Sequence, residues 1–156
     1  MIPSGASAPL IAANALASAI WIGGLVVIFL VARIASRTLD PEYRVAFFRG
    51  LGRAYGILGT GALLVALGTG AILVDQEHGW DSLAIAGAVL AGALLLATGL
   101  GMAQARAMTR LRRRALGEPG LADRVRQGAT LAGVLRSAIG MLTFALLLLA
   151  SALIAE

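Results

Sequence analysis

Long uncharged stretches dominate the pattern of hydrophobic and polar positions along the chain. A helix needs roughly 20 apolar residues to cross about 30 Å of hydrocarbon, and four stretches reach that length: 8–32, 54–74, 82–105 and 137–155. These stretches, with short tails and connections, use nearly all of the 156 residues. The pattern therefore predicts an all-α fold, a polytopic membrane four-helix bundle, with residues 1–156 forming a single integral membrane domain.

Composition agrees with this prediction and leaves no room for a separate soluble domain. Hydrophobic residues make up 59% of the chain and charged residues 13%. The mean hydropathy of +0.88 is far from the balance of soluble proteins. The chain contains no cysteine, which excludes disulfides and thiolate metal ligands.

Small residues recur inside the spans at four-residue spacing. In lipid, hydrophobicity cannot drive helices together, so small side chains that let backbones approach closely mark contact faces. The expected faces are Ala62, Ala66 and Gly70 in the second span, and Ala84, Ala88 and Gly92 with Ala93, Ala97 and Gly101 in the third. We therefore expect the helices to pack tightly.

The first span carries a motif made of Trp21, Gly23 and Gly24. The tryptophan lies away from the interfacial belts where this residue is enriched, and the glycines leave bare backbone beside it. A neighbouring helix can press onto the glycines while the indole fills the adjacent space. Packing is one interpretation of the motif, and a ligand pocket that uses the indole is the other.

The basic residues indicate how the chain is oriented. All 13 are arginine, and they lie between the first and second spans or between the third and fourth. The connection 75–81 between the second and third spans carries acids instead. Because arginines near span ends are retained on the cytoplasmic side, we expect a bacterial cytoplasmic membrane, with both termini and the acidic loop outside and the arginine-rich loops in the cytoplasm.

The connection after the first span predicts a short amphipathic interfacial helix. Its segment 40–42, Asp-Pro-Glu, is a helix start: an N-cap acceptor, a proline that is tolerated at the first position, and an acid at the positive end of the helix dipole. Beyond it, Phe47 and Tyr55 share an apolar stripe, while Arg49 and Arg53 share a basic one. This pattern is typical of a segment that lies in the headgroup layer before the chain enters the membrane.

A denser basic group follows the third span and consists of Arg110, Arg112, Arg113 and Arg114. Such clusters also bind nucleic-acid phosphates, but beside a membrane span anionic headgroups account for them. We expect these arginines, with Arg49 and Arg53, to bind headgroups, and we expect no nucleic-acid partner.

The two arginine-rich regions also resemble each other. Residues 37–44, followed by Arg53 and Gly56 at the second span, are echoed by residues 114–124, followed by Arg136 and Gly140 at the fourth. Two helical hairpins related by an axis along the membrane normal would produce this echo. The bundle would then consist of two tandem hairpins.

Residues 14–73 resemble the bacterial CopD (copper-resistance D) domain family. The resemblance rests on Trp-Ile-Gly-Gly at 21–24, Phe-Phe-Arg-Gly-Leu-Gly-Arg at 47–53 and Gly-Thr-Gly at 68–70. It implies a four-span protein of the cytoplasmic membrane that handles or takes up copper. Members often carry a histidine seven residues before the tryptophan, where this chain has Asn14, and an asparagine amide is a poor copper ligand.

The candidate metal site is the acidic loop. It holds the chain's one histidine, His78, among Asp75, Glu77 and Asp81. Imidazole and carboxylates at this spacing would bind Cu(II) or Zn(II) weakly; alternatively, these residues form a short solvated turn. Copper is thus the candidate cofactor, whereas haem is not expected because the spans hold no histidine pair.

The polar groups inside the spans do not indicate an enzyme. No acid lies in any span, which disfavours proton-coupled transport, and the residue sets for intramembrane proteolysis are missing. Two hypotheses remain. One is CopD-like metal handling or solute transport along a polar track of Asn14, Ser18 and Thr69. The other is a non-catalytic membrane subunit or scaffold that binds another membrane protein or a second copy of itself.

Overall fold

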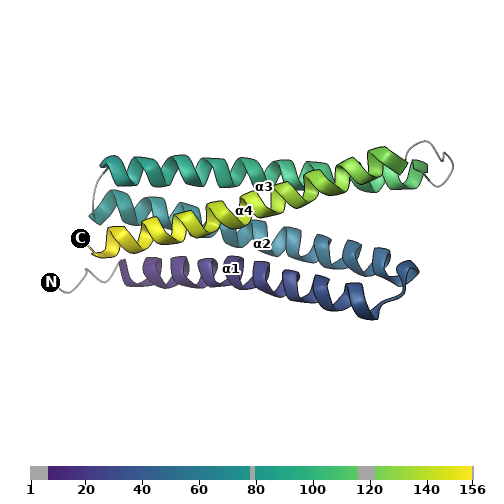
Figure 1. Ribbon diagram of the computed structural model, residues 1–156. Helices are drawn as coiled ribbons and strands as arrows, with labels where there is room; N and C mark the ends of the chain where they lie inside the picture. The colour runs from purple at the N-terminus through teal and green to yellow at the C-terminus, as the bar shows by residue number, and fades with distance from the viewer. Residues whose placement is uncertain (1–6, 78–79, 116–121, 156) are drawn as a thin grey trace. The chain divides into compact units, whose positions relative to one another are not determined.

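The described residues of the computed structural model are 7–77, 80–115 and 122–155. They form four α-helices: α1 (Ser7–Thr38), α2 (Pro41–Glu77), α3 (Ser82–Ala115) and α4 (Ala122–Ala155), and they include no strand (Figure 1). All four helices are long and apolar enough to cross a membrane. This confirms the predicted all-α class and the prediction of a small, multi-pass integral membrane protein.

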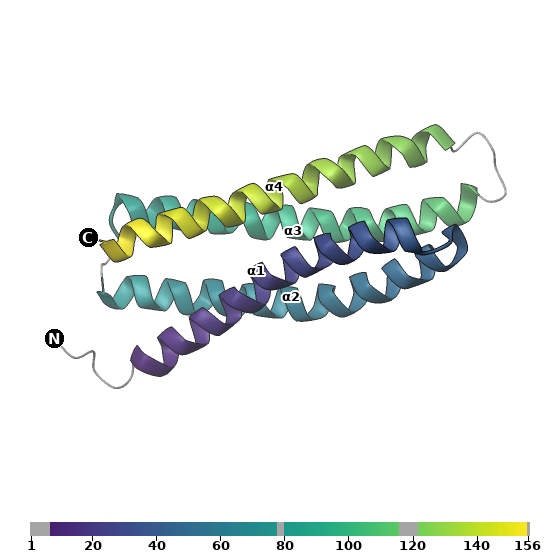
Figure 2. The ribbon, with the colours of Figure 1, turned by 60° about the horizontal axis from the view of Figure 1, so that its bottom comes forward.

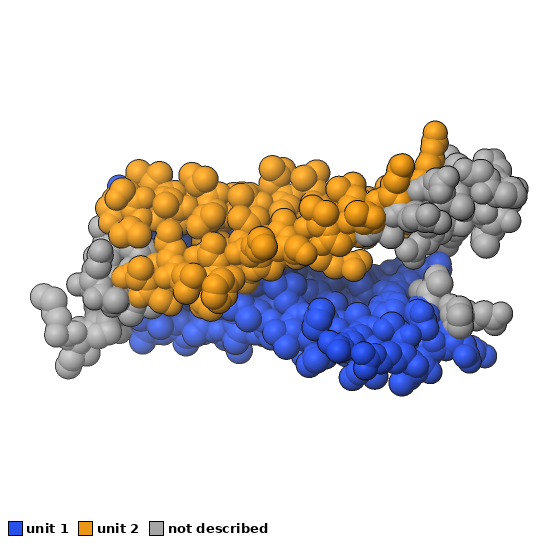
Figure 3. Space-filling view, in the orientation of Figure 1, with its two compact units in different colours: residues 1–80 blue, residues 81–156 orange. Residues whose placement is uncertain are grey.

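The chain divides into two compact units, residues 1–80 and 81–156 (Figure 3). Each unit is a helical hairpin in which two antiparallel helices pack along each other, α1 with α2 and α3 with α4 (Figures 1 and 2). The prediction of tandem hairpins within a four-helix protein is therefore confirmed.

The helices are longer than the predicted spans, and the short interfacial helix expected after the first span is not separate. Residues 41–53 form the first part of α2, which continues without a break to Glu77. Pro41 occupies the first position, where it is tolerated. Gly50, Gly52 and Gly56 each cost about 1 kcal/mol relative to alanine but keep their backbone hydrogen-bonding groups, so the helix persists.

Local hydrogen bonds fix where the helices begin and end. The Arg44 guanidinium donates to the Ser36 and Leu39 carbonyls, both at 2.9 Å, and so caps the negative C-terminal end of α1. The Asp40 carbonyl accepts the Arg44 N–H at 3.0 Å, which places Asp40 at the N-cap of α2, as predicted. At α3, Asp81 Oδ1 accepts the Ala84 N–H at 2.7 Å, a side-chain N-cap.

In the first hairpin the contact face of α1 follows alternating steps of three and four residues: Asn14, Ala17, Trp21 and Gly24. This is the spacing of a coiled-coil seam. Ala17 and Trp21 are buried. The residues of α2 that face them are small and include the buried Ala62 and, nearer the C-terminal end of α2, Ala66 and Gly70. The small-residue face predicted for the second span is therefore a contact face.

In the second hairpin the seam of α3 follows a seven-residue repeat. A Cβ added at Gly87 would lie 3.1 Å from Leu149 Cδ2, and one added at Gly101 would lie 3.7 Å from Ile139 Cδ1. Between them, Leu94 is almost fully buried. Of the two faces predicted for the third span, the one ending at Gly101 meets α4 there. In the other face Ala84 is buried, whereas Ala88 and Gly92 are exposed.

Candidate functional site

The first polar cluster inside a hairpin joins Asn14 of α1 to Ala66 and Thr69 of α2, and we call it the Asn14 clasp. Asn14 Nδ2 donates to the Ala66 carbonyl at 2.7 Å and to Thr69 Oγ1 at 3.0 Å. Thr69 Oγ1 in turn donates to the Val65 carbonyl at 2.6 Å. The two amide N–H groups of Asn14 are therefore both engaged by α2.

Gly70 borders the clasp. A Cβ at this position would lie 3.4 Å from Asn14 Nδ2, which is an ordinary van der Waals contact. Asn14 and Thr69 were predicted to share a polar track with Ser18, and the structure brings the first two together. Ser18, one turn further along α1, does not take part in the hydrogen bonds of the clasp.

The second cluster is aromatic and lies further along the same seam. The rings of Trp21 and Tyr55 stack with their centroids 6.4 Å apart and an interplanar angle of 22°. Tyr55 Oη donates to the Trp21 carbonyl at 2.9 Å. Two glycines face the tyrosine ring: a Cβ at Gly24 would overlap it, with Cζ and Oη only 2.7 Å away, and one at Gly59 would lie 2.8 Å from Cζ.

These contacts revise the interpretation of the tryptophan motif. Trp21 is 6% exposed and packs, and Gly24 is the glycine onto which α2 presses its tyrosine. Gly23 is exposed, and a Cβ added there would meet no heavy atom of the described hairpin within 4 Å. The expectation that Gly23 takes part in the close contact is therefore corrected, because the 100° turn per residue points it away from the seam.

Tyr55 is the residue that the sequence analysis misplaced. Its stripe with Phe47 was interpreted as lying in the headgroup layer, but the ring belongs to the contact between α1 and α2. The sequence does carry a signal for this contact. Gly59 lies one helical turn after Tyr55, and a small residue at i+4 provides room for a large ring.

The acidic loop falls partly outside the described residues. His78 lies outside them, as does the side chain of Glu77, so the predicted metal site stays a prediction. Asp75 Oδ1 accepts a hydrogen bond from Trp80 Nε1 at 2.9 Å, and Asp81 caps α3. Among the described side chains, no group of three histidines and acids is arranged to hold a metal ion.

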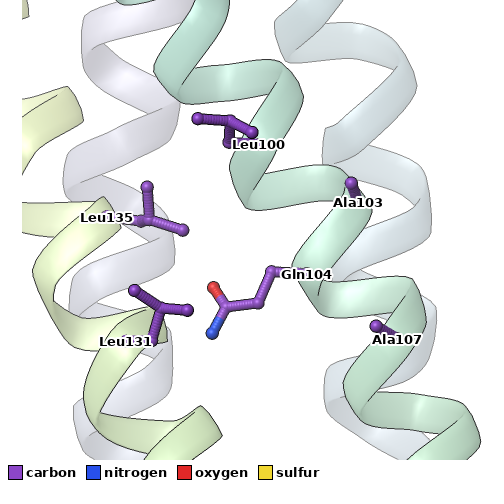
Figure 4. A pocket seen from close by; sticks show the side chains of 6 residues that line it. All are labelled: Leu100, Ala103, Gln104, Ala107, Leu131 and Leu135. Carbon is purple, nitrogen blue, oxygen red and sulfur yellow. The ribbon is translucent and has the colours of Figure 1, made fainter.

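The second hairpin has a polar contact of its own beside an open groove. Gln104 Nε2 of α3 donates to the Gly128 carbonyl of α4 at 2.7 Å. Next to this bond lies a groove of about 400 Å³, with Leu100, Ala103, Gln104 and Ala107 on one side and Leu131 and Leu135 on the other (Figure 4). No motif in the sequence marks Gln104 as a contact residue.

The arginines predicted to bind headgroups stand on helical extensions of the spans. Arg49 and Arg53 lie on α2 and Arg110 on α3, and all three are exposed. The side chains of Arg112, Arg113 and Arg114 lie outside the described residues, although their backbone belongs to α3. Because α2 and α3 continue as helix through these segments, the direction in which each arginine leaves its helix follows from its spacing to the contact residues of that helix.

The polar contacts within the two hairpins join helices and do not provide a chemically reactive group. Asn14, Tyr55 and Gln104 each bind a backbone carbonyl of the partner helix in the same hairpin, and none of them is a strong acid, base or metal ligand at neutral pH. Thr98 differs, since its buried hydroxyl oxygen has no hydrogen-bond partner among the described residues. Family models, curated proteins and solved structures gave no match to the chain, so the proposals that follow rest on these contacts.

Proposed function

We propose that this protein is a non-catalytic membrane subunit that acts by binding another membrane protein or a second copy of itself. The observation that carries the proposal is a face of α3 formed by Ala88, Gly92 and Gly99. All three are exposed, and a Cβ added at either glycine would meet no described heavy atom within 4 Å. We call these three residues the small face.

The small face points away from the α4 contact. At 100° per residue, Gly92 and Gly99 lie on one side of α3, while the seam residues Gly87, Leu94 and Gly101 lie on the other. In lipid, a helix surface without bulk favours the close approach of another helix, since association depends on packing and not on hydrophobicity. The small face therefore suits a further helix.

The polar residues support association more than conduction. Solute transport along Asn14, Ser18 and Thr69 would require the Asn14 clasp to open, because both amide N–H groups are engaged with α2. Interhelical hydrogen bonds measured in a membrane protein average about 0.6 kcal/mol each, and two of them join Asn14 to α2. The clasp is well suited to holding a hairpin in a fixed register for a partner.

The small face can be tested with one bulky substitution and a matched control. Gly92→Leu should shift the purified protein in mild detergent from its associated form towards the single chain, because the leucine keeps the partner helix at a distance. Val89→Leu, at a 67% exposed position of the same helix, should leave the distribution unchanged. The measurement is light scattering coupled to size-exclusion chromatography. Equal profiles for wild type and Gly92→Leu would refute the small face as the binding surface.

We further propose the orientation in which the arginine-rich ends of the hairpins face the cytoplasm. The absence of cysteine from the sequence makes the test direct. A thiol reagent that cannot cross membranes should label Asp75→Cys in intact cells, whereas Arg37→Cys should be labelled only after the membrane is opened. Both positions are exposed. The reverse labelling pattern would show that the orientation is inverted.

A further inference from the structure

We propose that the groove beside Gln104 binds one phospholipid with an anionic headgroup. Its acyl chain would lie between α3 and α4, and its phosphate would lie between Arg110 and Arg124. This inference is independent of the association proposed above, because it uses a different surface, the groove between α3 and α4.

The groove walls account for the binding of an acyl chain, but they do not account for the selection of one headgroup over another. The lining side chains are aliphatic apart from Gln104, and a space of about 400 Å³ is large enough for part of a lipid tail. Lipid tails are as apolar as leucine, so moving a tail from the bilayer into the groove brings little gain from apolarity alone. Selectivity must come from charged or polar groups at the end of the groove.

Two arginines lie near one end of the groove, and each is spaced seven residues from a residue that lines it. Arg124 precedes Leu131 by seven residues on α4, and Arg110 follows Ala103 by seven residues on α3. Seven residues are nearly two helical turns, so each arginine lies close to the face of its lining residue and about 10 Å along the helix axis. Both side chains are exposed. Because the helices are antiparallel, both displacements run towards the connection between α3 and α4, and the two cations reach the same level.

That level is suited to a phosphate. The 34 residues of α3 span about 50 Å, which exceeds the hydrocarbon thickness of about 30 Å, so the helix ends reach the headgroup layer. Basic sites between membrane helices on one side of the bilayer attract anionic lipid headgroups, and guanidinium groups bind phosphate oxygens through paired hydrogen bonds. Charge complementarity therefore selects an anionic phospholipid over a zwitterionic one.

Gln104 has a positioning role in this site. Its carboxamide extends from α3 towards Leu131 across the groove (Figure 4), and its bond to the Gly128 carbonyl at 2.7 Å holds α4 beside α3. Opposite that bond, Met108 packs where a Cβ at Gly128 would clash with its sulfur. The two helices are thus in direct contact at Gly128, beside the groove.

The test is a lipid titration of the purified full chain by native mass spectrometry. Phosphatidylglycerol and phosphatidylcholine with identical acyl chains serve as probes, and the spectra give the occupancy of the first bound lipid. Each arginine near an anionic group should contribute about five-fold in affinity, so the wild type should prefer phosphatidylglycerol by about thirty-fold. Arg110→Gln with Arg124→Gln should remove most of this preference, whereas Arg136→Gln, on another face of α4, should keep it.

The groove itself needs a separate variant. Leu131→Trp should fill the groove and lower binding of the first phosphatidylglycerol several-fold. Val134→Trp should not, because Val134 is also exposed on α4 but lies outside the groove lining. Circular dichroism and thermal melting confirm that each variant is folded. The proposal fails if the arginine pair and Arg136 have the same effect, or if Leu131→Trp binds like wild type. It also fails if inorganic phosphate displaces the lipid, or if a second copy of the chain occupies the groove.

Discussion

Replacing Gly24 with leucine should lower the melting temperature of the purified protein in detergent, whereas replacing Gly23 with leucine should leave it almost unchanged. The Tyr55 ring lies where even a Cβ at Gly24 would be, and its hydroxyl group is bonded to the Trp21 carbonyl at 2.9 Å. Moving the ring aside to admit leucine would disturb that bond and the stacking on Trp21. Overpacking of this kind typically costs about 1–3 kcal/mol, while an exposed substitution usually stays within about 0.5 kcal/mol.

A double variant separates this overlap from a general effect of leucine at position 24. In a Tyr55→Ala background the ring is gone, so Gly24→Leu should cost clearly less than it does in the wild type. A coupling of about 0.5–3 kcal/mol is typical of residues in direct contact. If both glycine variants melt alike, or if the two substitutions are additive, the tyrosine contact does not define the register of the hairpin.

Replacing Asn14 with leucine should destabilise the first hairpin by about 1–2 kcal/mol, since leucine has a similar shape and keeps neither hydrogen bond to α2. Ser18→Ala, one turn away, should change the free energy of unfolding by less than about 0.5 kcal/mol. Unfolding can be followed by circular dichroism in a mixed micelle with increasing denaturing detergent. An equal decrease in the free energy of unfolding for the two variants would indicate that Asn14 and Ser18 belong to one polar track.

The spans and the pairing into hairpins were predictable because both depend on patterns along a single chain. Uncharged length identifies a membrane helix whatever it packs against. Arginine clusters and the echo between residues 37–44 and 114–124 indicate where each hairpin turns. The helices extend beyond the predicted spans because the span ends were set by charge, and helix continues through charged residues such as Arg49 and Arg110 wherever nothing breaks its hydrogen bonds.

The contacts across each hairpin were harder to predict because they depend on the rotation of one helix against another. Gly23 and Gly24 look equivalent in sequence, yet only Gly24 meets Tyr55. Gln104 carries no motif, and its partner is a backbone carbonyl at Gly128, which sequence does not distinguish from any other. In α3 the four-residue spacing of small residues includes Gly101 but not the rest of the seam, which follows the seven-residue repeat of Gly87, Leu94 and Gly101.

The CopD-like resemblance and the copper site around His78 stay predictions, and they define the alternative to the proposed association. The imidazole would be the strongest ligand of that site, and Asn14, where the family often has histidine, is bound to α2. Copper bound by His78→Ala as tightly as by wild type would exclude the acidic loop as the metal site. Loss of copper in that variant would instead support metal handling.

The most direct measurement is the mass of the wild-type protein released from its own membrane in mild detergent, without added metal or chelator, by native mass spectrometry. Association predicts a metal-free complex that contains two copies of the chain or one copy with a second membrane protein, with bound lipid resolved as separate adducts. A single chain that carries one copper ion and no protein partner would contradict the proposed function.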